Sequence, residues 1–170
     1  ATALAARIAE QHVAAFVGWT EHPAPEVRAF AVAFLAQQAA DIAVKATVAA
    51  VKDADVNVRN VALASLTPRH AAAAPELIRL SESEDWSVRL AAVRAQGAIL
   101  EATGPAAVIA SLSQRATADR TAIVREAALA ALAKGAKPAA RPVLERARDS
   151  DPEPHVRAAA GAWLSSFSAP

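Results

Sequence analysis

Few side chains in this sequence have the types and the spacing that catalysis or metal binding requires. The 4 histidines lie far apart, and none stands in a His-x-x-x-His or Glu-x-x-His pattern that would place two ligands on one helical face. No serine lies in a Gly-x-Ser-x-Gly turn, and the 5 glycines form no phosphate-binding loop. The absence of cysteine excludes disulfides, thiolate metal sites and cysteine nucleophiles. We therefore expect no enzyme, no bound metal and no cofactor.

The polar and aromatic residues that remain are better suited to binding. Glu82, Glu84 and Asp85 form a small acidic cluster, which either caps the helix that follows or attracts a cation or a basic partner. Trp86 comes next, in the expected first turn of that helix. Because exposed tryptophans are enriched at the centres of interfaces, Trp86 is a candidate partner contact, with local packing as the alternative.

Trp86 belongs to a short motif that recurs five times, and in every copy a valine is followed at once by an arginine. The third copy reads Asp85-Trp86-Ser87-Val88-Arg89. The arginines are separated by 31, 30, 36 and 32 residues (59−28, 89−59, 125−89, 157−125). A period of this length is typical of helical solenoids, in which each unit buries its apolar face against its neighbours. The five arginines are Arg28, Arg59, Arg89, Arg125 and Arg157.

Each copy of the motif continues as one face of a helix. An alanine stands four residues after the valine, and mostly apolar residues stand five and eight residues after it, as on one stripe of an α-helix. A small residue at this place allows neighbouring helices to approach closely, whereas a larger one would overpack the contact. The five alanines are Ala31, Ala62, Ala92, Ala128 and Ala160.

The residues before each Val-Arg pair favour the start of a helix. Asp55 and Asp85 lie four residues before their arginines, where a carboxylate can cap free backbone N–H groups. Pro25 and Pro154 fall in the expected first turn, where the missing N–H of proline is not needed. These signals and the apolar periodicity predict ten helices in five antiparallel pairs. The spacing of 36 residues also predicts an insertion, which we place in the polar stretch 113–121.

This pattern resembles the HEAT-like repeats of the phycobilisome-lyase type, in which an Asp-Pro-x-Val-Arg-x-x-Ala-x-x-Ala-Leu signature opens the second helix of each pair. The copy from Asp55 to Leu66 matches without the proline, and the copy that begins at Glu153 keeps the proline but has glutamate for aspartate. The resemblance implies that the arginine of one unit pairs with an acidic turn residue of an adjacent unit. The implied structural ladder contains Arg28, Arg59, Arg89, Arg125 and Arg157, with Asp55 and Asp85.

The expected fold class is all-α, an α-solenoid (superhelix) of about five antiparallel helix-pair HEAT-like repeats. We expect one domain over residues 1–170, with repeats at approximately 1–38, 39–68, 69–101, 102–135 and 136–170. No charge-free apolar run approaches the roughly 20 residues of a membrane span, and no signal segment is evident. We therefore expect a cytoplasmic protein, although an exported one or a fragment of a longer repeat protein fits the same pattern.

Charge is distributed unevenly along the chain. Residues 1–85 carry seven basic and ten acidic side chains (net −3), whereas residues 86–170 carry eleven and seven (net +4), and the sum is the overall +1. A basic tract indicates either a surface for nucleic acid or an acidic partner, or an ordinary solvated face.

Three function classes follow from these observations. A non-catalytic protein-interaction scaffold is favoured, because stacked helix pairs create an extended surface without any reactive group. A DNA-binding or alkylated-base repair protein is the first alternative, since HEAT-like proteins of that class combine a basic face with aromatic and acidic side chains. A chromophore-lyase-type enzyme or its subunit is the second alternative, and only the resemblance implies it.

A scaffold of this kind would hold its protein partner on the face of the second helices that points away from the alanine stripe. That face is mostly alanine, so its few polar members would provide specificity. We name Asn60, Arg94 and Glu126, together with Trp86, as candidate partner contacts, and we place Leu90 on the same face. Trp163 is expected to close the last core layer or to contact a further repeat or partner. Nothing in the pattern indicates an oligomeric state.

Overall fold

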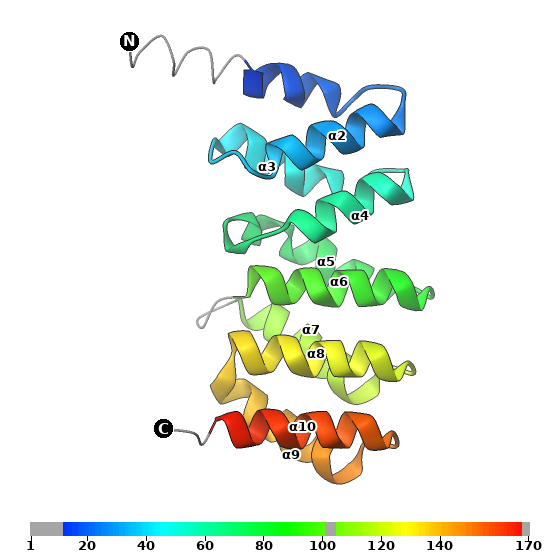
Figure 1. The fold of residues 1–170 in the computed structure, drawn as a ribbon, viewed down its shortest axis with the longest axis vertical. Helices are drawn as coiled ribbons and strands as arrows, with labels where there is room; N and C mark the ends of the chain where they lie inside the picture. Colours follow the sequence, from blue (N-terminus) through cyan, green and yellow to red (C-terminus); the bar gives the residue numbers. More distant parts are fainter. Residues whose placement is uncertain (1–11, 101–104, 168–170) are drawn as a thin grey trace. The chain divides into compact units, whose positions relative to one another are not determined.

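The computed structural model describes residues 12–100 and 105–167, and every regular element within these ranges is helical (Figure 1). The predicted all-α repeat fold is therefore confirmed. Contacts within the chain divide it into two compact units, residues 1–73 and residues 74–170, and the boundary falls inside the predicted third repeat. A single domain with the five repeat boundaries given above remains a prediction.

The first unit contains a helix over residues 12–19, then α2 (Pro25–Leu35), α3 (Asp41–Ala50), α4 (Val56–Ser65) and the 3₁₀ helix η1 (Pro68–Ala73). The two Val-Arg helices, α2 and α4, pack against each other, while α3 packs against η1. Asp55 caps α4 as predicted, because its Oδ1 accepts hydrogen bonds from the backbone N–H of Asn57 at 2.8 Å and of Val58 at 3.2 Å. The first helix of the predicted repeat at residues 1–38, expected over residues 2–18, lies mostly outside the described residues.

The second unit contains α5 (Ala74–Leu80), α6 (Trp86–Ile99), α7 (Ala106–Ala118), α8 (Ala122–Gly135), α9 (Lys137–Ser150) and α10 (Pro154–Ser166). The Val-Arg helices α6, α8 and α10 form one layer, in which α8 packs against both of the others. Figure 1 shows these three one below the other in green, yellow and red. The first helices of the pairs form the second layer, in which α7 packs against α5 and α9.

The core of both units follows the predicted stripe. All five motif alanines have 0% of their surface exposed, which supports their assignment as positions of close helix packing. Leucine occupies the end of the stripe in four copies, and Gln96 replaces it in the third. Gln96 is fully buried, and its Nε2 donates to the carbonyl oxygen of Leu77 at 3.1 Å, which ties α6 to α5.

The predicted insertion at residues 113–121 is wrong. Residues 113–118 continue α7, because Ser113 Oγ donates to Ile109 O at 2.8 Å and Thr117 Oγ1 donates to Ser113 O at 2.9 Å. Because these hydroxyl groups bond to carbonyls of the preceding turn, the serine and the threonine are compatible with a continuous helix. α6 ends at Ile99 and α7 begins at Ala106, whereas residue 136 alone separates α8 from α9, so the bounds of the described helices put the additional length between α6 and α7.

Candidate functional site

The five motif arginines lie in the first turns of the second helices and close the turns that precede them. In every copy, Nη1 donates to a backbone carbonyl five or six residues earlier. Arg28 Nη1 lies 2.9 Å from His22 O and 3.1 Å from Pro23 O, and Arg157 Nη1 lies 3.0 Å from Pro152 O. The guanidinium group therefore donates hydrogen bonds to carbonyl oxygens of the turn that have no backbone N–H partner within it.

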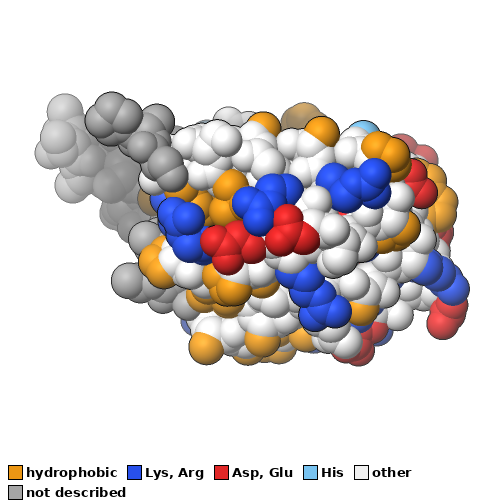
Figure 2. Space-filling model, turned by 90° about the horizontal axis from the view of Figure 1, so that it is seen from below, with side chains coloured by type: hydrophobic (Ala, Val, Ile, Leu, Met, Phe, Trp, Pro, Cys, Tyr) orange, Lys and Arg blue, Asp and Glu red, His pale blue; other side chains and the backbone are white. Residues whose placement is uncertain are grey.

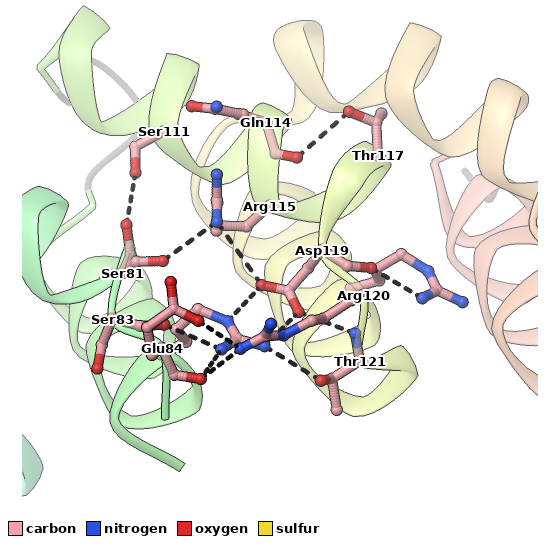
Figure 3. Close-up of polar contacts among 12 residues, drawn as sticks. Ser81, Ser83, Glu84, Ser111, Gln114, Arg115, Thr117, Asp119, Arg120 and Thr121 are labelled. Carbon is pink, nitrogen blue, oxygen red and sulfur yellow. Dashed lines mark hydrogen bonds and ion pairs between the residues drawn. The ribbon is translucent and has the colours of Figure 1, made fainter. Parts of the chain in front are cut away.

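Three of these arginines also bind an aspartate of a neighbouring turn. Arg89 is the most fully bonded of them: its Nε and Nη2 donate to the carboxylate of Asp119 at 2.8 and 3.0 Å, and Nη2 also donates to Thr121 Oγ1 at 3.1 Å. Figure 3 labels the acceptors Asp119 and Thr121 and shows Arg115 beside Asp119. Its Nη1 donates to Ser83 O and Glu84 O, both at 2.9 Å, so all five N–H groups have acceptors. The bidentate pairs are Arg28–Asp53, Arg89–Asp119 and Arg125–Asp151.

The acidic members of this ladder differ from the two that the sequence analysis named. Asp55 and Asp85 cap their own helices and form no ion pair with a motif arginine in the described residues. The paired aspartates stand six residues before the arginine of their own copy. From this position Asp119 also stabilises its turn, because its Oδ1 accepts a hydrogen bond from Thr121 N at 2.9 Å. The corresponding positions of the first and third copies hold His22 and Ser83.

The pairing keeps the ladder aspartates ionised. The hydrogen bond from Arg125 lowers the pKa of Asp151 although burial opposes the shift, and Arg28 acts in the same way on the pKa of Asp53. Burial alone would raise the pKa of Asp119, but hydrogen bonds from Arg89 and from the backbone outweigh it, and the pKa is lowered. The three bidentate pairs, two of them buried and one partly buried, thus neutralise each other's charges and support the fold.

A groove of about 550 Å³ lies on the α6, α8 and α10 layer of the second unit. Its central wall is α8, which contributes residues from Ile123 to Lys134, while α6 contributes Arg94 and α10 contributes Trp163. The other lining residues are small, apart from Glu126: Gly97, Ala98, Ala127, Ala130 and Ala131. The groove therefore has an apolar floor of small residues and a few larger side chains around it.

The close approach of α6 and α8 requires the glycine in this floor. A Cβ atom built on Gly97 would lie 2.8 Å from the Cβ of Ala131, closer than two carbon atoms can approach without movement. Because the residues at this contact are small, their side chains do not fill the space on the exposed side of α6 and α8, and this space is the groove.

The two basic side chains at the groove differ from most other basic side chains of the second unit. Within the part of the chain that the structure describes, Arg94 and Lys134 are exposed and make no hydrogen bond, ion pair or ring contact. Arg146 on α9 shares this condition but lies outside the groove. Glu126 has one polar neighbour, because its Oε2 lies 3.9 Å from His155 Nε2.

The remaining basic residues of the second unit have partners. Arg115 lies 3.8 Å from Asp119, Arg120 lies 3.1 Å from Glu84, and Arg148 lies 2.7 Å from Asp149. Figure 2 shows acidic and basic side chains interspersed on the face seen from below, over α9 and α10. The net positive charge of this half of the sequence is therefore not gathered into a basic stripe on that face.

The sequence-predicted contact residues separate into two groups. Arg94 and Glu126 line the groove, whereas Asn60 and Trp86 are exposed elsewhere, with 50% of the Trp86 surface accessible. The placement of Leu90 on the exposed face, away from the alanine stripe, is wrong, because Leu90 is buried. α6 packs against both α5 and α8, so the buried part of its surface is wider than the alanine stripe. Sequence reasoning missed Lys134 and Gly97, and it assigned Trp163 mainly to the core.

A second hollow, of about 520 Å³, lies in the first unit. Its lining residues are Trp19, His22, Glu26, Val27 and Phe30. Trp19 and Phe30 expose 43% and 62% of their surfaces, which is unusual for large apolar side chains in a folded unit. No signal in the repeat pattern pointed to this hollow.

Within the described residues, no group of three or more His, Cys, Asp or Glu side chains is placed to hold a metal ion. None of the helices in these ranges is long and apolar enough to cross a membrane.

Comparison with known proteins gives a family match and a structural match. The family model of HEAT repeats matches residues 44–133. The structure is similar to that of the complex of CpcE and CpcF of phycocyanin lyase from Nostoc sp. PCC7120, with a TM-score of 0.65 and 22% sequence identity over 89% of this chain and 97% of that chain. No curated protein sequence matches the chain. At this identity the structural likeness concerns the fold.

Proposed function

The chain belongs to the HEAT-repeat family, and we propose that it is a non-catalytic scaffold that binds an acidic helical segment of a partner protein in the groove of its second unit. The single observation that carries this proposal is the location of two unpaired cations, Arg94 and Lys134, at an apolar groove in a unit whose other cations are mostly paired.

The repeats themselves provide an internal comparison for these side chains. Counted from the valine of each motif, the position of Arg94 is alanine in all four other copies: Ala33, Ala64, Ala130 and Ala162. The position that corresponds to Trp163 is occupied in the other four copies by Phe34, Ser65, Ala95 and Ala131, of which two are alanine. Because the same helix packing forms with alanine, neither Arg94 nor Trp163 is required by the repeat fold. Their presence at the groove supports a binding role.

The shape of the groove suits a helix. Its lining residues on α8 extend from Ile123 to Lys134, which are 11 residue steps apart and therefore roughly 16 Å along the axis at 1.5 Å per residue, or three helical turns. Small floor residues allow the backbone of a docked helix to approach closely, and Trp163 and Ile123 offer apolar contacts for its larger side chains. Acidic side chains on its flanks would meet Arg94 and Lys134.

A subunit of a lyase is a second candidate function, and the similarity to the complex of CpcE and CpcF favours it. On this hypothesis the partner would be a second helical-repeat chain, and the pair would act on a linear tetrapyrrole. A pigment bound by the purified chain, visible as absorbance, would support this candidate. Nucleic-acid binding has less support, because most arginines of the basic half are paired with acidic side chains.

Site-specific photo-crosslinking tests the scaffold proposal. A photoreactive amino acid replaces Ala98, an exposed residue of the groove, or Ala110, an exposed residue of α7 outside it. In native extract we expect a discrete crosslinked protein from position 98 and none from position 110. The crosslinked segment should be acidic and helical.

Charge-reversal variants complete this test. Arg94→Glu and Lys134→Glu should each weaken binding of the recovered segment roughly tenfold, which corresponds to about 1.4 kcal/mol. Arg146→Glu is the matched control, because Arg146 is also unpaired but lies outside the groove. Equal effects of all three substitutions would show a general charge effect and contradict the proposal, as would equal crosslinking from positions 98 and 110.

A further inference from the structure

The hollow of the first unit has a chemistry that differs from that of the groove. Four of the seven aromatic residues of the chain (4 Phe and 3 Trp) lie here: Phe16, Trp19, Phe30 and Phe34. Phe16 stacks on Phe34 with ring centroids 3.9 Å apart, and these two half-buried rings pack against the core residues Val13, Leu35 and Ala43. They form a fixed base for the more exposed rings.

Trp19 and Phe30 both contact Phe16 and both line the hollow. Their centroids lie 4.7 and 5.8 Å from that of Phe16, and their planes are tilted by 52° and 44° relative to it. The faces of aromatic rings carry partial negative charge and attract cations, with tryptophan the most effective. Two exposed rings that share a third as support therefore form a surface on which an organic cation can be held.

The charged groups around the hollow have the sign that a cation requires. Glu26 is the lining residue with a carboxylate, and it makes no hydrogen bond or ion pair in the described residues. The nearby guanidinium of Arg28 is bonded to Asp53 at 2.8 Å and to two turn carbonyls, so it does not neutralise Glu26 by direct contact. His22 Nδ1 accepts from Ala24 N at 3.0 Å, which leaves the proton of the neutral ring on Nε2.

The turn that carries this site is well fixed. Backbone N–H groups of Thr20, Glu21 and His22 donate to the carbonyls of the preceding helix, and Arg28 of α2 donates to the carbonyls of His22 and Pro23. A wall that is already ordered loses little conformational entropy when a ligand binds.

The repeat comparison again shows that these side chains are not needed for packing. The position of Phe30 holds Val61, Ala91, Ala127 and Ala159 in the other copies, and the position of Glu26 holds Asn57, Ser87, Ile123 and His155. The first copy alone combines an exposed aromatic ring with a carboxylate at these two places.

We propose that the hollow lined by Trp19, Phe30 and Glu26 binds a small organic cation, an alkylated ammonium group of the trimethylammonium type attached to an apolar body. The rings contact the alkyl groups, and Glu26 balances the charge. The volume of about 520 Å³ lies within the range of small-molecule sites, roughly 300–1,000 Å³, and exceeds what a trimethylammonium group alone would fill. This site is independent of the groove in the second unit.

Nuclear magnetic resonance of the full chain with labelled tryptophan tests the proposal. The 3 tryptophans give three indole N–H signals, and the variant Trp19→Phe identifies that of Trp19. The probes, at constant ionic strength, are choline chloride and its neutral carbon isostere, in which a tert-butyl group replaces the trimethylammonium group. We expect choline to shift the Trp19 signal saturably, and the isostere to bind at least about threefold more weakly.

Variants locate the bound cation. Glu26→Gln and Phe30→Ala should each weaken choline binding by about three- to tenfold. Glu21→Gln is the control, because this exposed acid lies in the same turn but does not line the hollow. The affinity of this variant for choline should stay within about twofold of that of the parent chain. Circular dichroism of each variant checks that the fold is kept.

Four results would overturn the proposal: no shift of Trp19, equal binding of choline and its isostere, equal effects of Glu26→Gln and Glu21→Gln, or unchanged affinity in Phe30→Ala. A blocked lysine or arginine dipeptide provides a further arm. If such a dipeptide shifts Trp19 and choline does not, the hollow holds a side chain of a protein partner and the assignment to a small cation is wrong.

Discussion

Replacing Asp119 with alanine should lower the free energy of unfolding by about 3–5 kcal/mol, because the change leaves a buried guanidinium without its counter-ion. The side chains of Arg89 and Asp119 are 3% and 1% exposed, so water cannot replace the lost partner. Asp119 also lies 3.8 Å from Arg115 and accepts the turn hydrogen bond of Thr121 N at 2.9 Å. One substitution therefore removes two charge-assisted hydrogen bonds, a further ion pair and a turn contact.

The matched control is Glu84→Gln. Glu84 pairs with Arg120 at 3.1 Å in the same region, but the two side chains are 94% and 66% exposed. An exposed pair contributes about 0–1 kcal/mol, so this variant should unfold close to the parent chain. Urea denaturation, followed by circular dichroism and tryptophan fluorescence, measures both values.

A double variant separates the loss of an ion pair from the burial of an unpaired charge. Arg89→Met with Asp119→Leu removes both charges, and it should be much less destabilised than Asp119→Ala alone. The reasoning fails if Asp119→Ala costs no more than Glu84→Gln, or if the double variant is less stable than the single one.

Three further predictions concern packing, capping and pH. Ala92→Leu should cost about 1–3 kcal/mol, since Ala92 is fully buried at a helix contact; an unaltered urea midpoint would contradict the close-packing assignment. Asp55→Ala should cost about 1 kcal/mol through the lost cap of α4, while Asp55→Asn, which keeps the acceptor, should cost less; equal losses would argue against capping. The pKa values of Asp53 and Asp151 are lowered in the folded chain, so their stabilisation is present above the ordinary aspartate pKa and is lost as pH falls through the lowered values. The free energy of unfolding should therefore fall below about pH 4, and Asp151→Asn should flatten this acid limb; an equally steep limb in the variant would contradict the assignment.

The helical repeat was predictable from the sequence because its signals are periodic or local. The motif arginines recur every 30 to 36 residues, and the alanine stripe and the caps of α4 and α6 each lie within one or two helical turns. The sequence pattern misplaces the insertion because serine and threonine are common in loops, whereas Ser113 and Thr117 donate hydrogen bonds to carbonyls within α7 and so remain helical.

The ladder acids and the groove were harder to predict, for different reasons. Asp55, four residues before its arginine, matches the pattern of a helix cap and was therefore the obvious acidic residue of the motif. The carboxylate that pairs with Arg28 is that of Asp53, two residues earlier. The signal for the true partner is an aspartate six residues before the arginine, as at Asp119 and Asp151. The groove depends on the spacing between adjacent helices, which the contact between Gly97 and Ala131 sets and which periodicity does not reveal.

The exposed charges of the α6, α8 and α10 layer were partly predictable. Arg94 and Glu126 point away from the alanine stripe, so their helical position alone identified them. Trp163 could not be assigned in this way, because a large apolar side chain near the end of a chain can equally well close a core.

The indole signal of Trp163 provides the most direct test of the claim that this layer is a docking surface. On titration with the segment recovered by crosslinking at position 98, we predict a saturable change of that signal, and we predict that Arg94→Glu shifts the titration to higher concentrations. A Trp163 signal that stays constant while the segment binds would place the partner elsewhere and contradict the account.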